Sequence, residues 1–318
     1  MNYLVTGGTG FVGAYAVKAL VEAGHRVTVF DLMLNREYLA DVLGGSADEV
    51  QLIGGDVTDL PAVLRAMRSA EAQRAVHLAA TLSVSSEANP LRTLKVNCEG
   101  TLNVFEAALA LGVSKVVWAS SVAVFGISGS REGFIDNNAH HEPTGLYGAV
   151  KSFNEHLGMH YKNQRGLDNI GLRFTVVYGY GKGLTVARGT GADFVTELLE
   201  KPAIGEPSVI RNGDDTPDFL YAEDVGRAIH LASEAPPCPL SGLTICGSTG
   251  SMRDAVAFVK RLLPDADLRV EGGHSIGTMN YDPSVTEAAI GYSPQFTMED
   301  GFRATINAMR KKHGLPPV

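Results

Sequence analysis

Four glycines fall within eight residues near the start of the chain, in the segment TGGTGFVG (Thr6–Gly13). Glycine is costly in regular structure because its backbone loses the most freedom on folding. This cluster follows an apolar run at 3–6 and precedes a helical pattern at 11–24. A strand, a glycine turn and a helix in this order bring backbone N–H groups and the positive helix end to one point. The segment therefore predicts a phosphate-binding loop.

The spacing G-x-x-G-x-x-G gives each glycine a separate task. We predict that Gly7 makes the tight turn, Gly10 admits the phosphates and Gly13 lets the helix pack on the sheet. Asp31 closes the second predicted strand, 18 residues after Gly13. Its carboxylate is expected to accept hydrogen bonds from a ribose and to repel a 2′-phosphate, which favours NAD over NADP.

Strand and helix patterns alternate through the first half of the chain. Strands are predicted at 3–6, 26–30, 50–55, 75–80, 115–121 and 169–174, and helices at 11–24, 60–70, 89–112 and 147–166. This alternation predicts an α/β fold with a Rossmann-type, doubly wound parallel sheet. We expect residues 1–175 to form the NAD-binding domain, with 217–235 returning to it, and 176–318 to form a smaller α/β substrate lobe.

Composition and charge exclude several classes of protein. The net charge of −8 and the pI of about 5.6 do not indicate a nucleic-acid surface. No apolar run reaches the roughly 18 residues that a membrane span needs. The three cysteines, Cys98, Cys238 and Cys246, lack metal-site spacing, so we expect reduced thiols, no bound metal and a cytoplasmic location.

Two short motifs carry the chemistry. SSVAVFG (120–126) ends the fifth predicted strand, and YGAVK (147–151) opens the following helix. Tyr147 and Lys151 are four residues apart, so they share one helix face. A cation beside a phenol lowers its pKa, which suits Tyr147 as the acid/base that takes a proton from an alcohol while hydride leaves. Ser121 is expected to hold that alcohol.

Together these motifs resemble an extended short-chain dehydrogenase/reductase, the superfamily that includes NAD-dependent epimerases and dehydratases. Further matches are GDVTD (55–59), HLAA (77–80), LRFTVVYG around Arg173 and DFLYAEDVGRAI (218–229). The resemblance implies that Ser121, Tyr147, Lys151 and Asn97 are catalytic. It implies NAD contacts from Gly7, Gly10, Phe11, Val12, Gly13, Asp31, Asp56, Val57, Leu78, Ala79, Ala80, Asn97, Tyr147, Lys151, Phe174 and Val176. It also implies a homodimer formed through the helices at 90–111 and 147–165.

Three departures from the family pattern bear on the substrate. Val122 and Ala123 stand where similar 4,6-dehydratases carry an Asp-Glu pair, which disfavours dehydration. Val176 replaces an asparagine of nucleotide-sugar enzymes, and Pro217 replaces an arginine that grips their diphosphate. The candidates for substrate contact are Ser83, Ser121, Arg188 and Arg211.

We therefore expect, first, an NAD-dependent dehydrogenase or reductase acting on a secondary alcohol or ketone of a small polyhydroxylated or sugar-like substrate. The alternative is a nucleotide-sugar 4-epimerase, which would oxidise its substrate transiently with tightly bound NAD. A non-catalytic NAD-sensing module is a third reading, and the unbroken set of Ser121, Tyr147 and Lys151 argues against it.

His140 and His141 are expected to be solvated histidines of a long loop at 126–146, and Asp59 is expected to be a helix N-cap.

Overall fold

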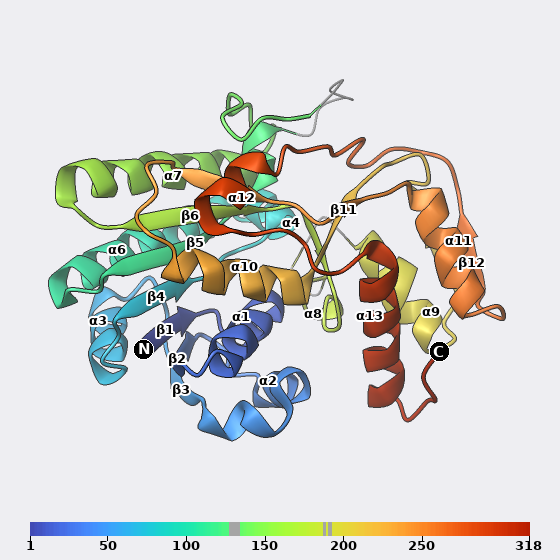
Figure 1. Ribbon diagram of the computed structural model, residues 1–318, viewed down its shortest axis with the longest axis horizontal. Coiled ribbons are helices and arrows are strands. Elements are labelled where there is room, and N and C mark those ends of the chain that lie inside the picture. Colours follow the sequence, from blue (N-terminus) through green and yellow to red (C-terminus); the bar gives the residue numbers. More distant parts are fainter. Residues whose placement is uncertain (127–133, 187–188, 190–192) are drawn as a thin grey trace.

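The computed structural model describes residues 1–126, 134–186, 189 and 193–318. Figure 1 shows a large sheet covered by helices and, beside it, a smaller lobe that contains α9, α11 and α13. In the described ranges, no helix is both long enough and apolar enough to cross a membrane. The three cysteines are free thiols.

A seven-stranded parallel sheet is the centre of the larger lobe. Its order is β10-β6-β5-β4-β1-β2-β3. The strands are β1 (Asn2–Thr6), β2 (Arg26–Asp31), β3 (Gln51–Gly54), β4 (Arg74–His77), β5 (Lys115–Ser121), β6 (Asn169–Phe174) and β10 (Gly242–Ile245). The direction of strand succession reverses between β1 and β4, where ligands bind in open α/β sheets. The doubly wound α/β fold predicted from the sequence is confirmed.

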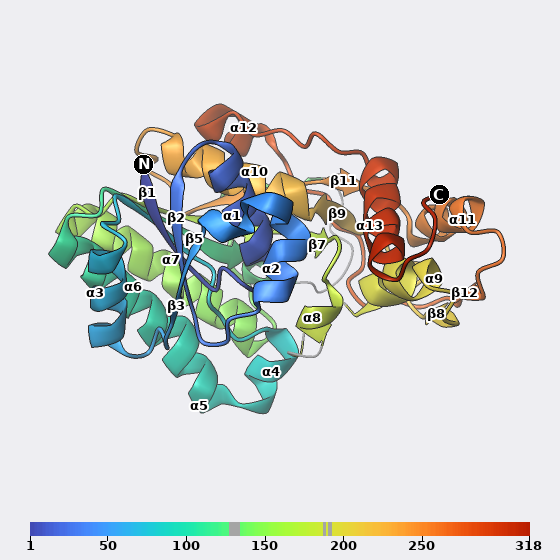
Figure 2. The same cartoon turned by 90° about the horizontal axis from the view of Figure 1, so that it is seen from below.

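Helices cover both faces of this sheet (Figure 2). They are α1 (Phe11–Glu22), α2 (Arg36–Leu43), α3 (Leu60–Ser69), α4 (Ser83–Ala88), α5 (Pro90–Thr93), α6 (Gly100–Leu111), α7 (Leu146–Arg165), α10 (Ala222–Glu234) and α12 (Ser284–Ile290). The helix predicted at 89–112 is present at 90–111, and Leu94–Glu99 forms a π-helical segment within it, between α5 and α6. Such segments are frequent at functional sites. Short 3₁₀ turns occupy Gly44–Glu49 and Val122–Phe125.

The smaller lobe has its own sheets and its own apolar core. A three-stranded sheet contains β7 (Val176–Tyr178), β9 (Asp218–Tyr221) and β11 (Ser248–Thr249), and a two-stranded sheet contains β8 (Ser208–Ile210) and β12 (Leu268–Val270). Its helical segments are α8 (Gly183–Val186), a π turn at Thr196–Glu200, α9 (Lys201–Ala203), α11 (Met252–Leu262) and α13 (Met298–Lys312). Tyr178, Phe219 and Phe302 pack edge to face at its centre.

The boundary between the two lobes is crossed several times by the chain. The expected division at residue 175 stays a proposal. Within the range 176–318, α10 packs against α1, α12 lies against β10, and β10 is hydrogen-bonded to β6 in the large sheet. The carboxyl ends of the parallel strands β1, β4, β5 and β6 therefore lie at one edge of the sheet, on the side of the smaller lobe (Figure 1).

Candidate active site

The glycine loop admits no side chain at Gly7 or Gly13. Gly7 has a φ of +70°, and a Cβ atom there would lie 2.7 Å from the backbone nitrogen of Ala79. A Cβ on Gly13 would lie 2.0 Å from the carbonyl oxygen of Gly7. Gly10 is the N-cap of α1 and offers no side-chain cap. The first N–H groups of α1 are thus available to an anion, and the loop fits a dinucleotide diphosphate.

Asp31 ties the glycine loop to the end of β2. Its Oδ2 accepts hydrogen bonds from the backbone nitrogen of Thr9 at 3.0 Å and from Thr9 Oγ1 at 2.8 Å. Asp56 accepts from the backbone nitrogen of Thr58 at 2.9 Å. The contacts of Asp31 with ribose and of Asp56 with NAD stay predictions. Asp59 is the N-cap of α3, as predicted, and accepts from the backbone nitrogen of Ala62.

Asn97 lies in the π-helical segment and holds the loop that follows β4. Its side chain accepts from the backbone nitrogen of Thr81 at 2.8 Å and donates to the Thr81 carbonyl at 3.1 Å. Its own carbonyl accepts from Asn154 on α7 at 2.7 Å and from Thr101 at 2.6 Å. These contacts make Asn97 a positioning residue for the segment Leu78–Thr81, and a direct catalytic role stays a prediction.

The three predicted catalytic residues meet at the carboxyl end of β5. Ser121 ends this strand, and its Oγ accepts from the backbone nitrogen of Ala123 at 3.2 Å. Lys151 is buried, donates to the Ala119 carbonyl at 2.6 Å, and has its Nζ 5.5 Å from the centre of the Tyr147 ring. Tyr147 shares a hydrogen bond with Ser121. One strand end and one helix face therefore assemble the set.

Burial controls the ionisation of this set. It raises the pKa of Tyr147 to about 12, and the hydrogen bond with Ser121 only partly opposes that rise. Burial also lowers the pKa of Lys151 to about 8. The expected lowering of the pKa of Tyr147 by Lys151 and the nicotinamide ring stays a prediction: in the protein alone burial raises this pKa, and the opposing cause is the hydrogen bond with Ser121. A further positive charge near Tyr147 is needed to ionise it close to neutral pH.

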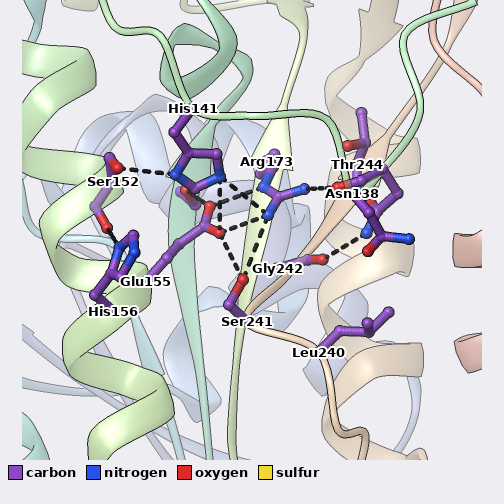
Figure 3. A network of polar contacts seen from close by, with 12 residues as sticks. Asn138, His141, Ser152, Glu155, His156, Arg173, Leu240, Ser241, Gly242 and Thr244 are labelled. Carbon is purple, nitrogen blue, oxygen red and sulfur yellow. Dashed lines mark hydrogen bonds and ion pairs between the residues drawn. The ribbon is translucent and has the colours of Figure 1, made fainter.

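A buried ion pair lies one helical turn beyond Lys151 (Figure 3). Glu155 on α7 accepts from Arg173 on β6, through Nε at 2.8 Å and Nη2 at 2.6 Å. Ser120 and Ser241 also donate to the Glu155 carboxylate. Burial alone would raise the pKa of Glu155, but the hydrogen bond and charge of Arg173 outweigh it and hold that pKa below its ordinary value.

His141 belongs to this network, which corrects the expectation of a solvated loop histidine. Its Nδ1 is 2.8 Å from Ser152 Oγ, and its Nε2 is 3.6 Å from Glu155 Oε2. Its ring also packs edge-on against Phe125. Burial lowers its pKa. Tyr147, Lys151 and Glu155 recur every four residues, and this spacing was the signal that could have identified Glu155.

The other predicted residues lie on several different elements. Phe11 and Val12 open α1, Val57 packs beside Gly100, Leu78, Ala79 and Ala80 follow β4, Phe174 ends β6, and Val176 begins β7. Ser83 is the first residue of α4, and Arg188 lies outside the described residues. Arg211 is not joined to the catalytic set: its side chain is 75% exposed and its Nε is 3.9 Å from Glu271. The described ranges contain no group of three His, Cys, Asp or Glu residues that could hold a metal ion.

Known proteins resemble this chain over most of its length. The profile of the NAD dependent epimerase/dehydratase family matches residues 3–239. A UDP-glucose 4-epimerase of Neisseria meningitidis is 25% identical over 330 residues, which cover 96% of this chain and 97% of that protein. A solved UDP-glucose 4-epimerase from Thermus thermophilus, in complex with NAD, aligns with a TM-score of 0.81 and 26% identity over 98% of this chain and 99% of that one. An L-threonine dehydrogenase from Cupriavidus necator has a TM-score of 0.83 at 22% identity over 98% of this chain and 100% of that one, a likeness in fold alone.

The ion pair of Glu155 and Arg173 gives a stability prediction. Arg173→Met should lower the free energy of unfolding by about 3–5 kcal/mol near neutral pH, because it leaves a buried carboxylate without its partner. Urea denaturation followed by circular dichroism measures this change. Arg253→Met, which removes an exposed pair with Asp214, is the matched control and should change stability little.

The same variant should show a pH dependence of defined sign. The folded pKa of Glu155 is lowered, so its contribution is present above the unfolded value of about 4.3 and is lost as the pH falls through the folded pKa. The stability gap between wild type and Arg173→Met should therefore narrow below about pH 4. A gap that stays constant from neutral to acidic pH would contradict the ionic origin of the effect.

Proposed function

The chain belongs to the NAD dependent epimerase/dehydratase family, and from this premise we propose that it is a nucleotide-sugar 4-epimerase. It is an enzyme of that family and its cofactor is NAD. The observation that carries the proposal is the assembled set of Ser121, Tyr147 and Lys151 in a chain that matches 4-epimerases almost end to end. The sequence alone favoured net dehydrogenation, whereas the named relatives favour the alternative.

The proposed reaction uses one proton carrier on the protein. When bound, NAD supplies a hydride acceptor and a positively charged ring. Tyr147 takes the proton of the sugar 4-hydroxyl as hydride leaves the same carbon, so the substrate becomes a ketone. Ser121 donates a hydrogen bond to the substrate oxygen. If the ketone turns over before it is reduced, hydride from the cofactor would reach its opposite face, Tyr147 would give the proton back to the oxygen, and the 4-hydroxyl would be inverted.

The charges around Tyr147 agree with this role. With a pKa of about 12, Tyr147 is protonated at neutral pH and needs cations to ionise. Lys151, with a pKa of about 8, carries a positive charge at that pH. The charged ring of NAD would add a second cation only when the cofactor is bound. Proton transfer would then be coupled to cofactor binding.

A net dehydrogenase acting on a small alcohol is the second candidate, and two residues favour it. Val176 is buried at the start of β7 and Pro217 precedes β9, where the two strands pair. Neither side chain donates a hydrogen bond, so two groups that would grip a substrate diphosphate are missing. Each charged hydrogen bond is worth about 1.5–3 kcal/mol, so the loss of two such bonds would weaken binding of a nucleotide sugar.

Product analysis distinguishes the two candidates. We expect the purified protein with NAD to interconvert UDP-glucose and UDP-galactose, or another UDP-sugar pair, without accumulation of NADH. NMR of the sugar anomeric protons and NADH absorbance are the measurements. If NADH accumulates with sugar acids or amino-acid alcohols and no UDP-sugar gives an epimer, the enzyme is a net dehydrogenase and the proposed epimerase activity is refuted.

Substitution of Tyr147 tests the acid/base role. Tyr147→Phe should lower kcat by about 10²- to 10⁴-fold, the usual contribution of general acid–base catalysis. The Kd for NAD, measured by calorimetry, should change little. Tyr161→Phe is the control, since Tyr161 lies on the same helix and contacts Glu106 instead. A kcat of Tyr147→Phe equal to that of the wild type would refute the role of Tyr147 as the acid/base.

The homodimer expected through 90–111 and 147–165 remains part of the proposal. Leu91, Leu94 and Leu102 on the first segment and Phe153 on α7 are exposed, with Leu91 at 67% and Phe153 at 52%. Exposed apolar groups on neighbouring helices are typical of protein interfaces. Phe153→Glu should convert a dimer to a monomer in light scattering, with the exposed Phe134→Glu as control. A wild-type protein that is monomeric at every concentration would refute the interface.

A further inference from the structure

Lys182 is a buried lysine whose ammonium makes no direct ion pair in the described part of the chain, where the opposing charge that acts on it is the carboxylate of Glu200. It lies between β7 and α8 and is 6% exposed. Within the described residues, its Nζ makes no hydrogen bond and no ion pair, and its one aromatic contact is with the Phe11 ring, 5.5 Å from the ring centre. An ammonium group that is shielded from water without a hydrogen-bond partner carries a desolvation penalty. Something outside the chain is expected to compensate it.

The carboxylate that influences Lys182 most is already engaged. Glu200 accepts from the backbone nitrogen of Gly183, at 3.0 and 3.2 Å to its two oxygens. The backbone nitrogens of Gly181 and Lys182 also donate to it. Glu200 therefore holds the turn that bears Lys182, and its charge acts on the ammonium without a direct ion pair. Burial lowers the pKa of Lys182 to about 8, despite the opposing charge of Glu200.

The position of the ammonium indicates what it serves. Phe11 is the first residue of α1, immediately after the Gly7–Gly10 turn. The N-terminus of α1 carries the partial positive charge of the helix. The Lys182 ammonium stands beside the ring of Phe11, so it adds a full positive charge to the neighbourhood of the helix terminus, where a cation is unfavourable without an anion. The segment that bears Lys182 lies between the two lobes in both views (Figures 1 and 2).

We propose that Lys182 is a cofactor-binding residue whose ammonium faces the diphosphate of NAD at the N-terminus of α1. A dianion there would neutralise the helix terminus and Lys182 together. The residue follows β7, so the cofactor would be held by the glycine loop and by a segment far along the chain. This role is independent of whether the reaction is epimerisation or net oxidation.

Binding of cofactor fragments tests the proposal. Lys182→Met should weaken binding of NAD and of ADP roughly 10- to 100-fold in calorimetry, as expected for loss of a charged hydrogen bond, while adenosine, which has no phosphate, binds as before. Lys182→Arg should keep most of the affinity for ADP. Lys18→Met is the matched control on α1, because Lys18 pairs with Glu223 at 2.5 Å, and it should leave all three affinities unchanged.

Two outcomes would overturn the proposal. One is an affinity of Lys182→Met for ADP that equals that of the wild type. The other is an equal loss of affinity for ADP and for adenosine. If Lys182→Met does not fold, NMR titration of the Lys182 ammonium in the wild-type protein decides. The pKa of Lys182 should rise when ADP is added and stay constant when adenosine is added, and a pKa that is insensitive to ADP would refute the role.

Discussion

The catalytic geometry depends on the hydrogen bonds that the buried carboxylate of Glu155 accepts. It accepts from Arg173 on β6, from Ser120 on β5 and from Ser241, which immediately precedes β10. A buried charge with several donors is held in one orientation, since loss of any donor leaves a costly unsatisfied group. Glu155 is one turn from Lys151 and two from Tyr147. The helix that carries the acid/base is therefore docked to the sheet by a directional contact as well as by apolar packing.

Sequence reasoning succeeded where the relevant residues are close together along the chain. The glycine spacing, the four-residue step from Tyr147 to Lys151 and the N-cap at Asp59 depend on local geometry that a pattern encodes directly. The alternation of strands and helices likewise predicted the doubly wound sheet. Each of these features follows from periodicity and backbone conformation, which do not require knowledge of distant partners.

The features that were missed join residues far apart. Asn97 meets Thr81 across 16 residues, Arg173 meets Glu155 across 18, and Asn137 reaches Thr244 across 107. The proximity of Lys182 to Phe11 is of the same kind. The effect of burial on the pKa of Tyr147 was missed for a related reason: a sequence reveals that a cation is near but not how far the phenol is desolvated. Burial is a property of the whole fold, so its effect on a pKa cannot be obtained from spacing.

The edge strand of the large sheet comes late in the chain. β10 pairs with β6, and the Asn137 side chain covers its outer side by bonding Gly242 O and Thr244 N. During synthesis on the ribosome, β6 emerges with one edge unpaired and remains so until Ile245 has left the exit tunnel. An open edge invites pairing with another chain. Domains that fold from their N-terminal end during translation usually bury such edges early. In this protein the nascent chain must instead keep an incomplete sheet from aggregating while much of the smaller lobe is still being made.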